Sequence, residues 1–149
     1  CRATGKTGFA QWAYKDACII DFDEWVTGYY NLPFVEAMDK YVAEFPESQH
    51  RYFNEIGRKY KDNPDVIVCD TFTYRKDRED FLCYIDKEFG IPKEEIKLLY
   101  LVAKYRTIEE RNRKRSGAVP ENIMLTMFYN QEFPTVSEKF GSVEIVANE

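Results

Sequence analysis

The sequence has few of the residues on which many small metal sites and disulfide scaffolds depend. It contains one histidine, so a metal site built on imidazole ligands is not expected. Its four cysteines show neither C-x-x-C spacing nor the density of a disulfide-stabilised secreted domain. We therefore expect free thiols and a cytoplasmic protein. The four cysteines are Cys1, Cys18, Cys69 and Cys83.

Long apolar runs and an excess of positive charge are also lacking. No stretch approaches the roughly 20 apolar residues of a membrane span, so no membrane association is expected. The formal net charge of -5 disfavours broad nonspecific binding to duplex nucleic acid, although basic residues cluster locally at 106–115. With 149 residues, of which 44% are hydrophobic, the chain is expected to form one folded domain over 1–149.

Helix-like and strand-like segments alternate along the chain, which predicts an α/β fold. The strand-like segments are continuous apolar runs, typical of a parallel sheet flanked by helices on both faces. Strands are expected at 17–20, 66–69, 96–102 and 143–146. Helices are expected at 7–14, 34–45, 47–61, 74–89, 108–115 and 120–129.

The first residues, CRATGKTG, contain the end of a phosphate-binding loop, whose full pattern is G-x-x-x-x-G-K-[ST]. Gly5, Lys6 and Thr7 match its last three places, and only the leading glycine is not in the sequence. The four variable places are filled by Cys1, Arg2, Ala3 and Thr4. The alternative interpretation is a surface G-K-T tripeptide with no ligand.

In the loop interpretation, the backbone from Cys1 to Gly8 cradles the phosphates of ATP at the start of a helix. Lys6 is expected to reach the β- and γ-phosphates, and the Thr7 hydroxyl to ligate Mg²⁺. A strand is expected ahead of Cys1. A fold that began at Cys1 would lack its central strand.

Carboxylates follow two of the expected strands. Asp70 closes the run at 66–69, where an acid is typical of a Walker B strand that organises magnesium. Asp21 and Asp23 follow the run at 17–20, where a kinase acting on a hydroxyl needs a carboxylate to accept the proton. The alternative for both places is capping of the helix that follows.

Arg111 and Arg115 are four residues apart and therefore share one face of a helix. Two guanidinium groups on one face suit a polyphosphate and the charge of its transition state. A glycine and a proline bound this segment, as expected of a mobile helical lid. The alternative is a solvated face paired with Glu109 and Glu110.

Taken in order, these elements resemble the polynucleotide-kinase-type P-loop kinases, which include the bacteriophage 5′-hydroxyl polynucleotide kinase domain. The most specific text is ERNRKR at 110–115, followed by AVPENIMLTM at 118–127. EFPT at 132–135 and the strand after it resemble the end of that family, so the similarity covers essentially the whole chain.

The resemblance implies a P-loop kinase fold with a helical lid, using ATP and Mg²⁺. It implies that Lys6 and Thr7 hold the phosphates and the metal, and that Asp23 is the general base. Asp70 matches the acid after the family's third strand. The lid arginines that grip the donor phosphates match Arg111 and Arg115.

The chain departs from the family near the acceptor. The family carries a basic residue shortly after the base, where this chain has Val26, preceded by Trp25. Aromatic residues nearby either stack on a nucleobase or pack in the core. They are Phe22, Trp25, Tyr29 and Tyr30.

The expected function is that of an ATP-dependent kinase whose acceptor is the 5′-hydroxyl end of RNA or DNA. One alternative is a kinase for a nucleoside or another small hydroxyl compound. Another is a nucleotide-binding regulatory module without catalysis.

Overall fold

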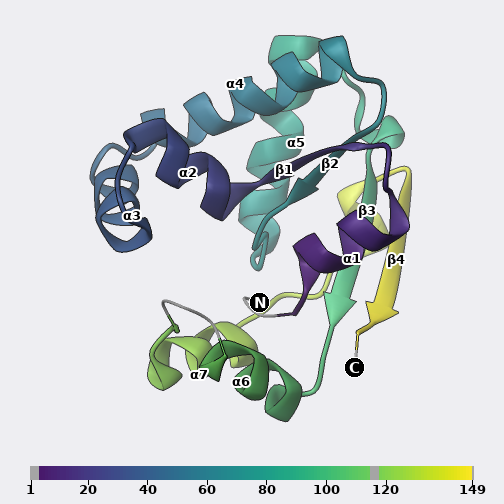
Figure 1. Ribbon diagram of the computed structural model, residues 1–149. Helices are drawn as coiled ribbons and strands as arrows, with labels where there is room; N and C mark the ends of the chain where they lie inside the picture. The colour runs from purple at the N-terminus through teal and green to yellow at the C-terminus, as the bar shows by residue number, and fades with distance from the viewer. Residues whose placement is uncertain (1–3, 115–117, 149) are drawn as a thin grey trace. The chain divides into compact units, whose positions relative to one another are not determined.

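The computed structural model describes residues 4–114 and 118–148, in which helices and parallel strands alternate (Figure 1). The α/β prediction is confirmed. The helices are α1 Lys6–Ala13, α2 Phe22–Tyr30, α3 Phe34–Ala43, α4 Glu47–Asp62, α5 Arg75–Phe89, α6 Tyr105–Arg113 and α7 Glu121–Tyr129. The strands are β1 Cys18–Asp21, β2 Val66–Cys69, β3 Lys97–Val102 and β4 Ser142–Ala147. Short 3₁₀ turns lie at Lys93–Glu95 and Val136–Glu138.

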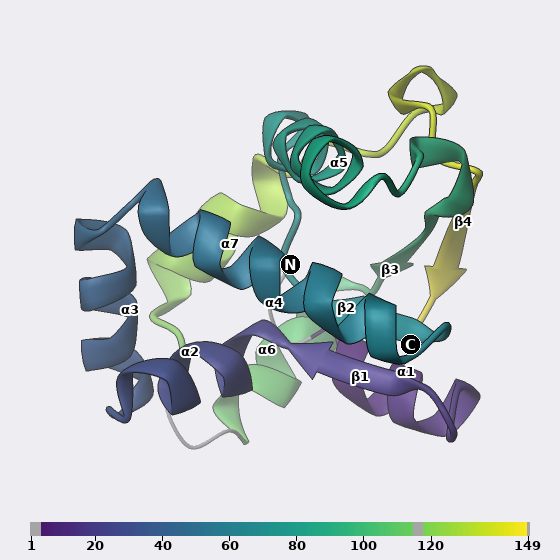
Figure 2. The same cartoon turned by 90° about the horizontal axis from the view of Figure 1, so that it is seen from above.

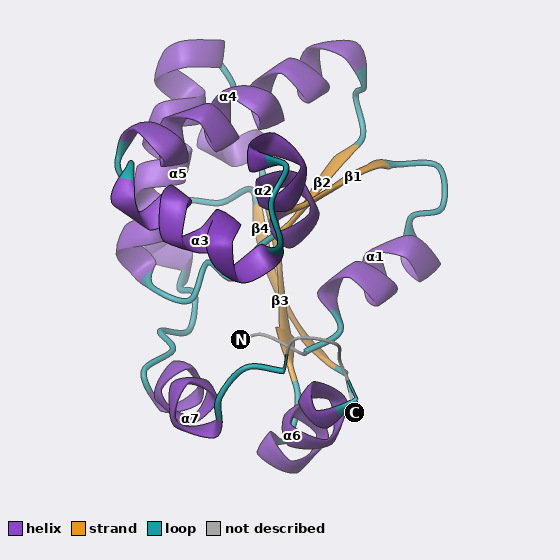
Figure 3. Cartoon of the chain, turned by 60° about the vertical axis from the view of Figure 1, so that its left-hand side comes forward, coloured by secondary structure: helices purple, strands orange, loops and turns teal. Residues whose placement is uncertain are grey.

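The described strands form two parallel pairs instead of the single sheet expected from the sequence (Figure 3). β1 pairs with β2, with Cys18 opposite Val66 and Asp21 opposite Cys69. β3 pairs with β4 along its whole length. In each pair a helical crossover joins the strands, as parallel pairing requires.

The described chain divides into two compact units. Residues 7–70 form one, here called the acid unit. Residues 4–6, 71–114 and 118–148 belong to the other, here called the loop unit. β1 and β2 lie in the acid unit, and β3 and β4 in the loop unit.

The acid unit is built around an aromatic and aliphatic core. α2 packs on β1 and α3, and α4 packs on β2 (Figure 2). Val26 and Ala37 are completely buried, and Tyr52, Phe53 and Ile56 of α4 are nearly so. The sequence analysis predicts no bounds for α2, because its sequence, FDEWVTGYY, is rich in residues with low helix propensity. Packing and a strong N-cap stabilise it instead.

The loop unit buries a charged pair in its core. Arg78 of α5 is 1% exposed, and its guanidinium contacts the Glu138 carboxylate through two hydrogen bonds, at 2.6 and 2.9 Å. Nη1 of Arg78 donates to the carbonyls of Phe72 and Glu132, at 2.9 and 3.0 Å. This network ties the start of α5 to the segment before β4.

Candidate functional site

The predicted phosphate loop enters α1 through a strained turn at Gly5, which has a φ of 86°. The Thr4 carbonyl accepts hydrogen bonds from Arg111 Nη1, at 3.1 Å, and from Asn148 Nδ2, at 2.5 Å. A Cβ on Gly5 would lie 2.6 Å from Asn148 Nδ2. Glycine suits this position because other residues rarely adopt this backbone angle, and a Cβ would also displace the end of the Asn148 side chain. Cys1, Arg2 and Ala3 lie outside the described residues.

The first turn of α1 carries Lys6 and Thr7 and has no acidic residue. The amides at a helix N-terminus, together with the helix dipole, favour an anion there. Gly8 is exposed, and a Cβ on it would meet nothing within 4 Å. The last three residues of the motif therefore form the turn before α1 and the start of its first turn.

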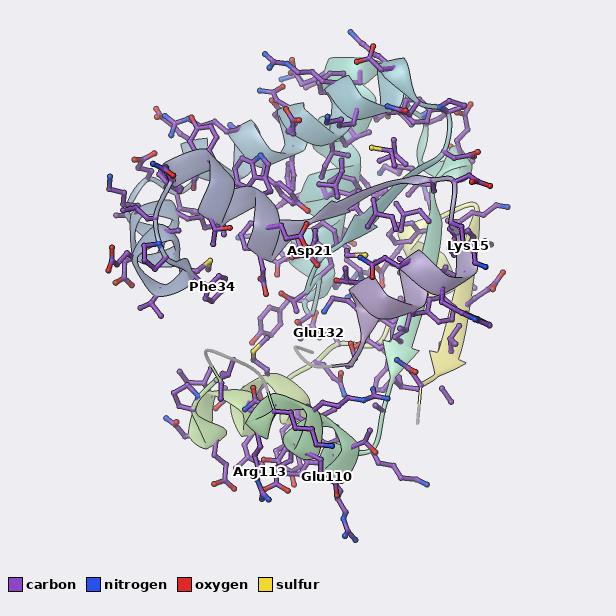
Figure 4. The ribbon with its side chains drawn as sticks, viewed as in Figure 1. Lys15, Asp21, Phe34, Glu110, Arg113 and Glu132 are labelled. Atoms are coloured by element: carbon purple, nitrogen blue, oxygen red, sulfur yellow. The ribbon has the colours of Figure 1, made fainter. Side chains whose placement is uncertain are left out.

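Asp21 organises the carboxyl end of β1 and takes the capping role that was the alternative interpretation for this segment. Its Oδ1 accepts from the backbone amides of Asp23, at 2.9 Å, and Glu24, at 3.2 Å. Its Oδ2 accepts from the Thr7 hydroxyl. Asp21 is thus the N-cap of α2, and it links α1 to the end of β1 (Figure 4). The signal in the sequence was an acid as the last residue of an apolar run, directly before a helix.

Asp23 lies in the first turn of α2 and is partly buried. The capping role considered for this segment belongs to Asp21, so capping does not account for Asp23. Its position in the first turn places a carboxylate close to the end of β1.

Asp70 follows β2 directly, and the pairing of Asp21 with Cys69 places it at the same end of the strand pair as Asp21. The next helix, α5, begins only at Arg75, with Tyr74 at its N-cap position, so Asp70 does not cap it. Burial raises the pKa of Tyr52 well above its usual value, and the nearby carboxylates of Asp70 and Asp21 raise it further. The acids at the ends of β1 and β2 thus both disfavour ionisation of one buried phenol.

Arg111 turns toward the loop instead of toward solvent. Its Nη1 donates to the Thr4 carbonyl and to the Asn148 carbonyl, at 3.1 and 3.2 Å, and lies 3.5 Å from where a Gly5 Cβ would stand. The structure therefore brings together Gly5 and Arg111, which are far apart in the sequence. Arg115 lies outside the described residues.

The other charges of α6 form the solvated face that was the alternative interpretation. Arg106 pairs with Glu110 at 3.2 Å, and Arg113 pairs with Glu109 at 2.6 Å. Figure 4 shows Glu110 and Arg113 on α6, and both side chains are exposed. The solvated-face interpretation therefore holds for Arg106 and Arg113, whereas Arg111 contacts backbone carbonyls.

Asn112 is a structural residue that the sequence analysis missed. It is 5% exposed, its Nδ2 donates to the Val119 carbonyl at 2.8 Å, and its Oδ1 accepts from the Val119 amide at 3.0 Å. This double contact fixes the backbone of Val119 against α6. A polar residue inside a highly charged segment gives no local signal of such burial.

The aromatic residues of α2 pack mainly against the protein itself. Phe22 is buried, with its ring centroid 5.0 Å from those of both Tyr41 and Tyr52. Trp25 stacks on Tyr29 at 5.2 Å, and the guanidinium of Arg51 lies 5.9 Å from the Tyr29 ring centroid. The core interpretation is confirmed for Phe22.

The site residues fall into two groups, each within one unit. Thr4, Gly5 and Lys6 lie in the loop unit with Arg111 and Asn148. The group in the acid unit consists of Thr7, Asp21, Asp23, Asp70 and Tyr52.

Comparison with known proteins yields no assignment: no protein-family model matches the chain, and no curated protein matches it significantly. Within residues 4–114 and 118–148, no three or more His, Cys, Asp or Glu side chains cluster so as to hold a metal ion. The helices in the same ranges are too short or too polar for any of them to span a bilayer.

Proposed function

We propose that the chain is an ATP-dependent phosphotransferase that moves the γ-phosphate to an acceptor hydroxyl. One observation carries the proposal. A glycine turn leads into the N-terminus of α1, and the threonine of its G-K-T motif is hydrogen-bonded to an acid at the end of a parallel strand. Phosphate-binding loops combine such a turn, lysine and hydroxyl.

On the donor side, the start of α1 and Lys6 bind the β- and γ-phosphates of ATP. Arg111 holds the loop through the Thr4 carbonyl. The other two nitrogens of its guanidinium carry further N–H donors, which suit phosphate oxygens. Arg111 thus shapes the loop and stabilises the charge that develops on the transferred group. Arg115 has the same proposed role on the strength of the sequence alone.

On the acceptor side, Asp23 accepts the proton of the hydroxyl as its oxygen attacks the γ-phosphorus. A new O–P bond forms, the bond between the γ-phosphorus and the bridging oxygen breaks, and ADP leaves with the electron pair. Asp21 positions the turn that carries Asp23 by accepting its backbone amide.

The oxygen donors of Thr7 and Asp70 fit Mg²⁺, which prefers hard oxygen ligands. Mg²⁺ is usually held by one or two protein carboxylates together with substrate phosphates and water, so a larger cluster of acids is not needed. When bound, the ion neutralises phosphate charge. The Thr7 hydroxyl is already oriented by its hydrogen bond to Asp21.

The acceptor we propose is the 5′-hydroxyl end of RNA or DNA, as the resemblance implies. A small hydroxyl compound is the second candidate, and one observation favours it. Val26 stands where the family has a basic residue, and it is completely buried. That position of α2 therefore offers no charge to an acceptor phosphate.

The test uses ATP labelled in its γ-phosphate, with Mg²⁺ and three acceptors: 5′-hydroxyl RNA, 5′-hydroxyl DNA and a pool of nucleosides and small alcohols. Asp23→Asn should reduce transfer by about 10²–10⁴-fold, the usual contribution of a general base. The matched control is Glu24→Gln, which neutralises an exposed carboxylate in the same turn of α2. Lys6→Ala should weaken ATP binding as well as transfer.

Label on oligonucleotide ends that depends on Asp23 would support the polynucleotide acceptor. Label only in the pool of small compounds would move the proposal to a metabolite kinase. ATP binding that Lys6→Ala abolishes, without transfer to any acceptor, would indicate a regulatory module and contradict the proposed activity.

A further inference from the structure

The Tyr52 hydroxyl is a buried polar group without a partner in the described part of the chain. Tyr52 lies on α4 and is 1% exposed, and no described residue accepts or donates a hydrogen bond at its hydroxyl. Its ring is held on two sides, by Phe22 at 5.0 Å and by Trp25 at 4.8 Å. A buried hydroxyl left unpaired is unfavourable, so native proteins nearly always provide a partner.

The surroundings of this hydroxyl are acidic. Four titratable groups act on the phenol, in decreasing order Asp70, Asp21, Cys69 and Tyr41. The Tyr52 ring contacts Phe22, the residue that follows Asp21, and Asp21 is paired with Cys69, the residue before Asp70. The phenol therefore lies near the carboxyl ends of β1 and β2. A neutral phenol is a donor, and the two strongest neighbours are acceptors when ionised.

We propose that Tyr52 is a positioning residue, whose hydroxyl donates through one buried water to the carboxylate of Asp70. A buried water typically makes about three hydrogen bonds, and the phenol, Asp70 and Asp21 supply that many polar partners. The bond orients Asp70 from the protein side. The role of Asp70 in binding magnesium rests on the proposed function, but the hydrogen bond itself does not.

The first experiment is a double-mutant cycle on thermal unfolding, without ATP or magnesium. Tyr52→Phe removes only the hydroxyl, and it should lower the melting temperature by about 3 °C in the wild-type background. In an Asp70→Ala background the same change should lower the melting temperature clearly less, since the water then keeps only Asp21 as a carboxylate partner. The matched control is Tyr60→Phe, on the exposed side of the same helix, and it should leave the melting temperature unchanged in both backgrounds.

A rise in melting temperature on Tyr52→Phe would overturn the proposal, because it would mean that the hydroxyl has no partner. An equal effect in both backgrounds would also overturn it, because the hydroxyl would not act on Asp70. Neither result depends on kinase activity.

The second readout is the magnesium concentration that half-saturates phosphate transfer. Loss of a group that orients a metal ligand typically weakens metal binding by about 10–100-fold, so Tyr52→Phe should raise this concentration at least tenfold. Tyr60→Phe should not change it. If the wild-type protein transfers no phosphate while the cycle shows coupling, the proposed function fails and the Tyr52–Asp70 link remains. Coupling with an unchanged magnesium requirement would overturn the positioning role.

Discussion

The two compact units differ in where their charged side chains lie. In the loop unit a full charge, Arg78, is buried and meets a carboxylate and several carbonyls. In the acid unit the core is aromatic, and the carboxylates lie at the ends of β1 and β2. Removing one partner of a buried charge pair destabilises a fold, whereas acids at the ends of parallel strands face the region where ligands of α/β proteins bind. The comparison separates a charge that is paired in the core from carboxylates that lie at the ends of strands.

The largest expected effect comes from breaking the buried pair of the loop unit. Glu138→Gln leaves the Arg78 guanidinium buried without its counter-charge, and we expect a loss of about 3–5 kcal/mol in the free energy of unfolding. Urea unfolding measures it. The control is Glu144→Gln, an exposed glutamate of β4, which should change little. A loss below about 1 kcal/mol would mean that the pair adds no more than a surface contact.

The same pair should make stability depend on pH. Burial raises the pKa of Glu138, but hydrogen bonds from Arg78 and from the Thr135 amide outweigh it, so the pKa lies below its usual value. A lowered pKa stabilises the fold above the unfolded-state value of 4.5, and this contribution disappears as the pH falls through the folded-state pKa. Between about pH 6 and pH 2, where carboxylates titrate, the free energy of unfolding of the wild type should fall more steeply than that of Glu138→Gln.

Local patterns predicted the strands well but not their partners. The run at 66–69 coincides with β2, and the other three predicted strands differ from the observed bounds by one residue at one or both ends. Continuous apolar runs are a local property and so are visible in the sequence. Pairing depends on long-range contacts, which is why one expected sheet is observed as two pairs.

The candidate site shows the same limit. The G-K-T motif and the acids after the strands are local signals, and they led to Lys6 and Asp70. Arg111 contacts the Thr4 carbonyl from more than a hundred residues away, and its spacing alone equally suited a pairing with glutamates. Arg78 sits in the charged run RKDRED, which resembles a solvated helix. Its burial follows from tertiary packing and has no local signature.

The next largest effect is expected at the turn of the predicted phosphate loop. Gly5→Ala places a Cβ 2.6 Å from Asn148 Nδ2 at a φ of 86°, so we expect a loss of about 1–2 kcal/mol from backbone strain alone. Gly8→Ala is the matched control, since its Cβ meets nothing and alanine favours a helix. Chemical unfolding should show that Gly5→Ala is less stable than the wild type and that Gly8→Ala is more stable. Equal effects would contradict the strained geometry of this turn.

A smaller effect is expected at the N-cap of α2. Asp21→Ala removes the acceptor of the Asp23 and Glu24 amides, and a lost cap typically costs about 1 kcal/mol. Asp21→Asn keeps an acceptor and should recover most of that loss in chemical unfolding. An alanine variant as stable as the wild type would show that α2 is held by its packing alone.

The smallest effect is expected at the exposed pair of α6, which sharpens the comparison most directly. Arg113 Nη2 and Glu109 Oε1 are 2.6 Å apart, the same distance as the contact between Arg78 Nε and Glu138 Oε2. The Arg113 side chain is 69% exposed, whereas that of Arg78 is 1% exposed. Water and salt weaken an exposed pair, so Glu109→Gln should cost at most about 0.5 kcal/mol, and less as salt is added. Chemical unfolding at low and high ionic strength measures both values. If Glu138→Gln and Glu109→Gln lost similar stability, the distance between the charged atoms would determine the strength of these pairs. We expect a several-fold difference, which would show that burial determines it.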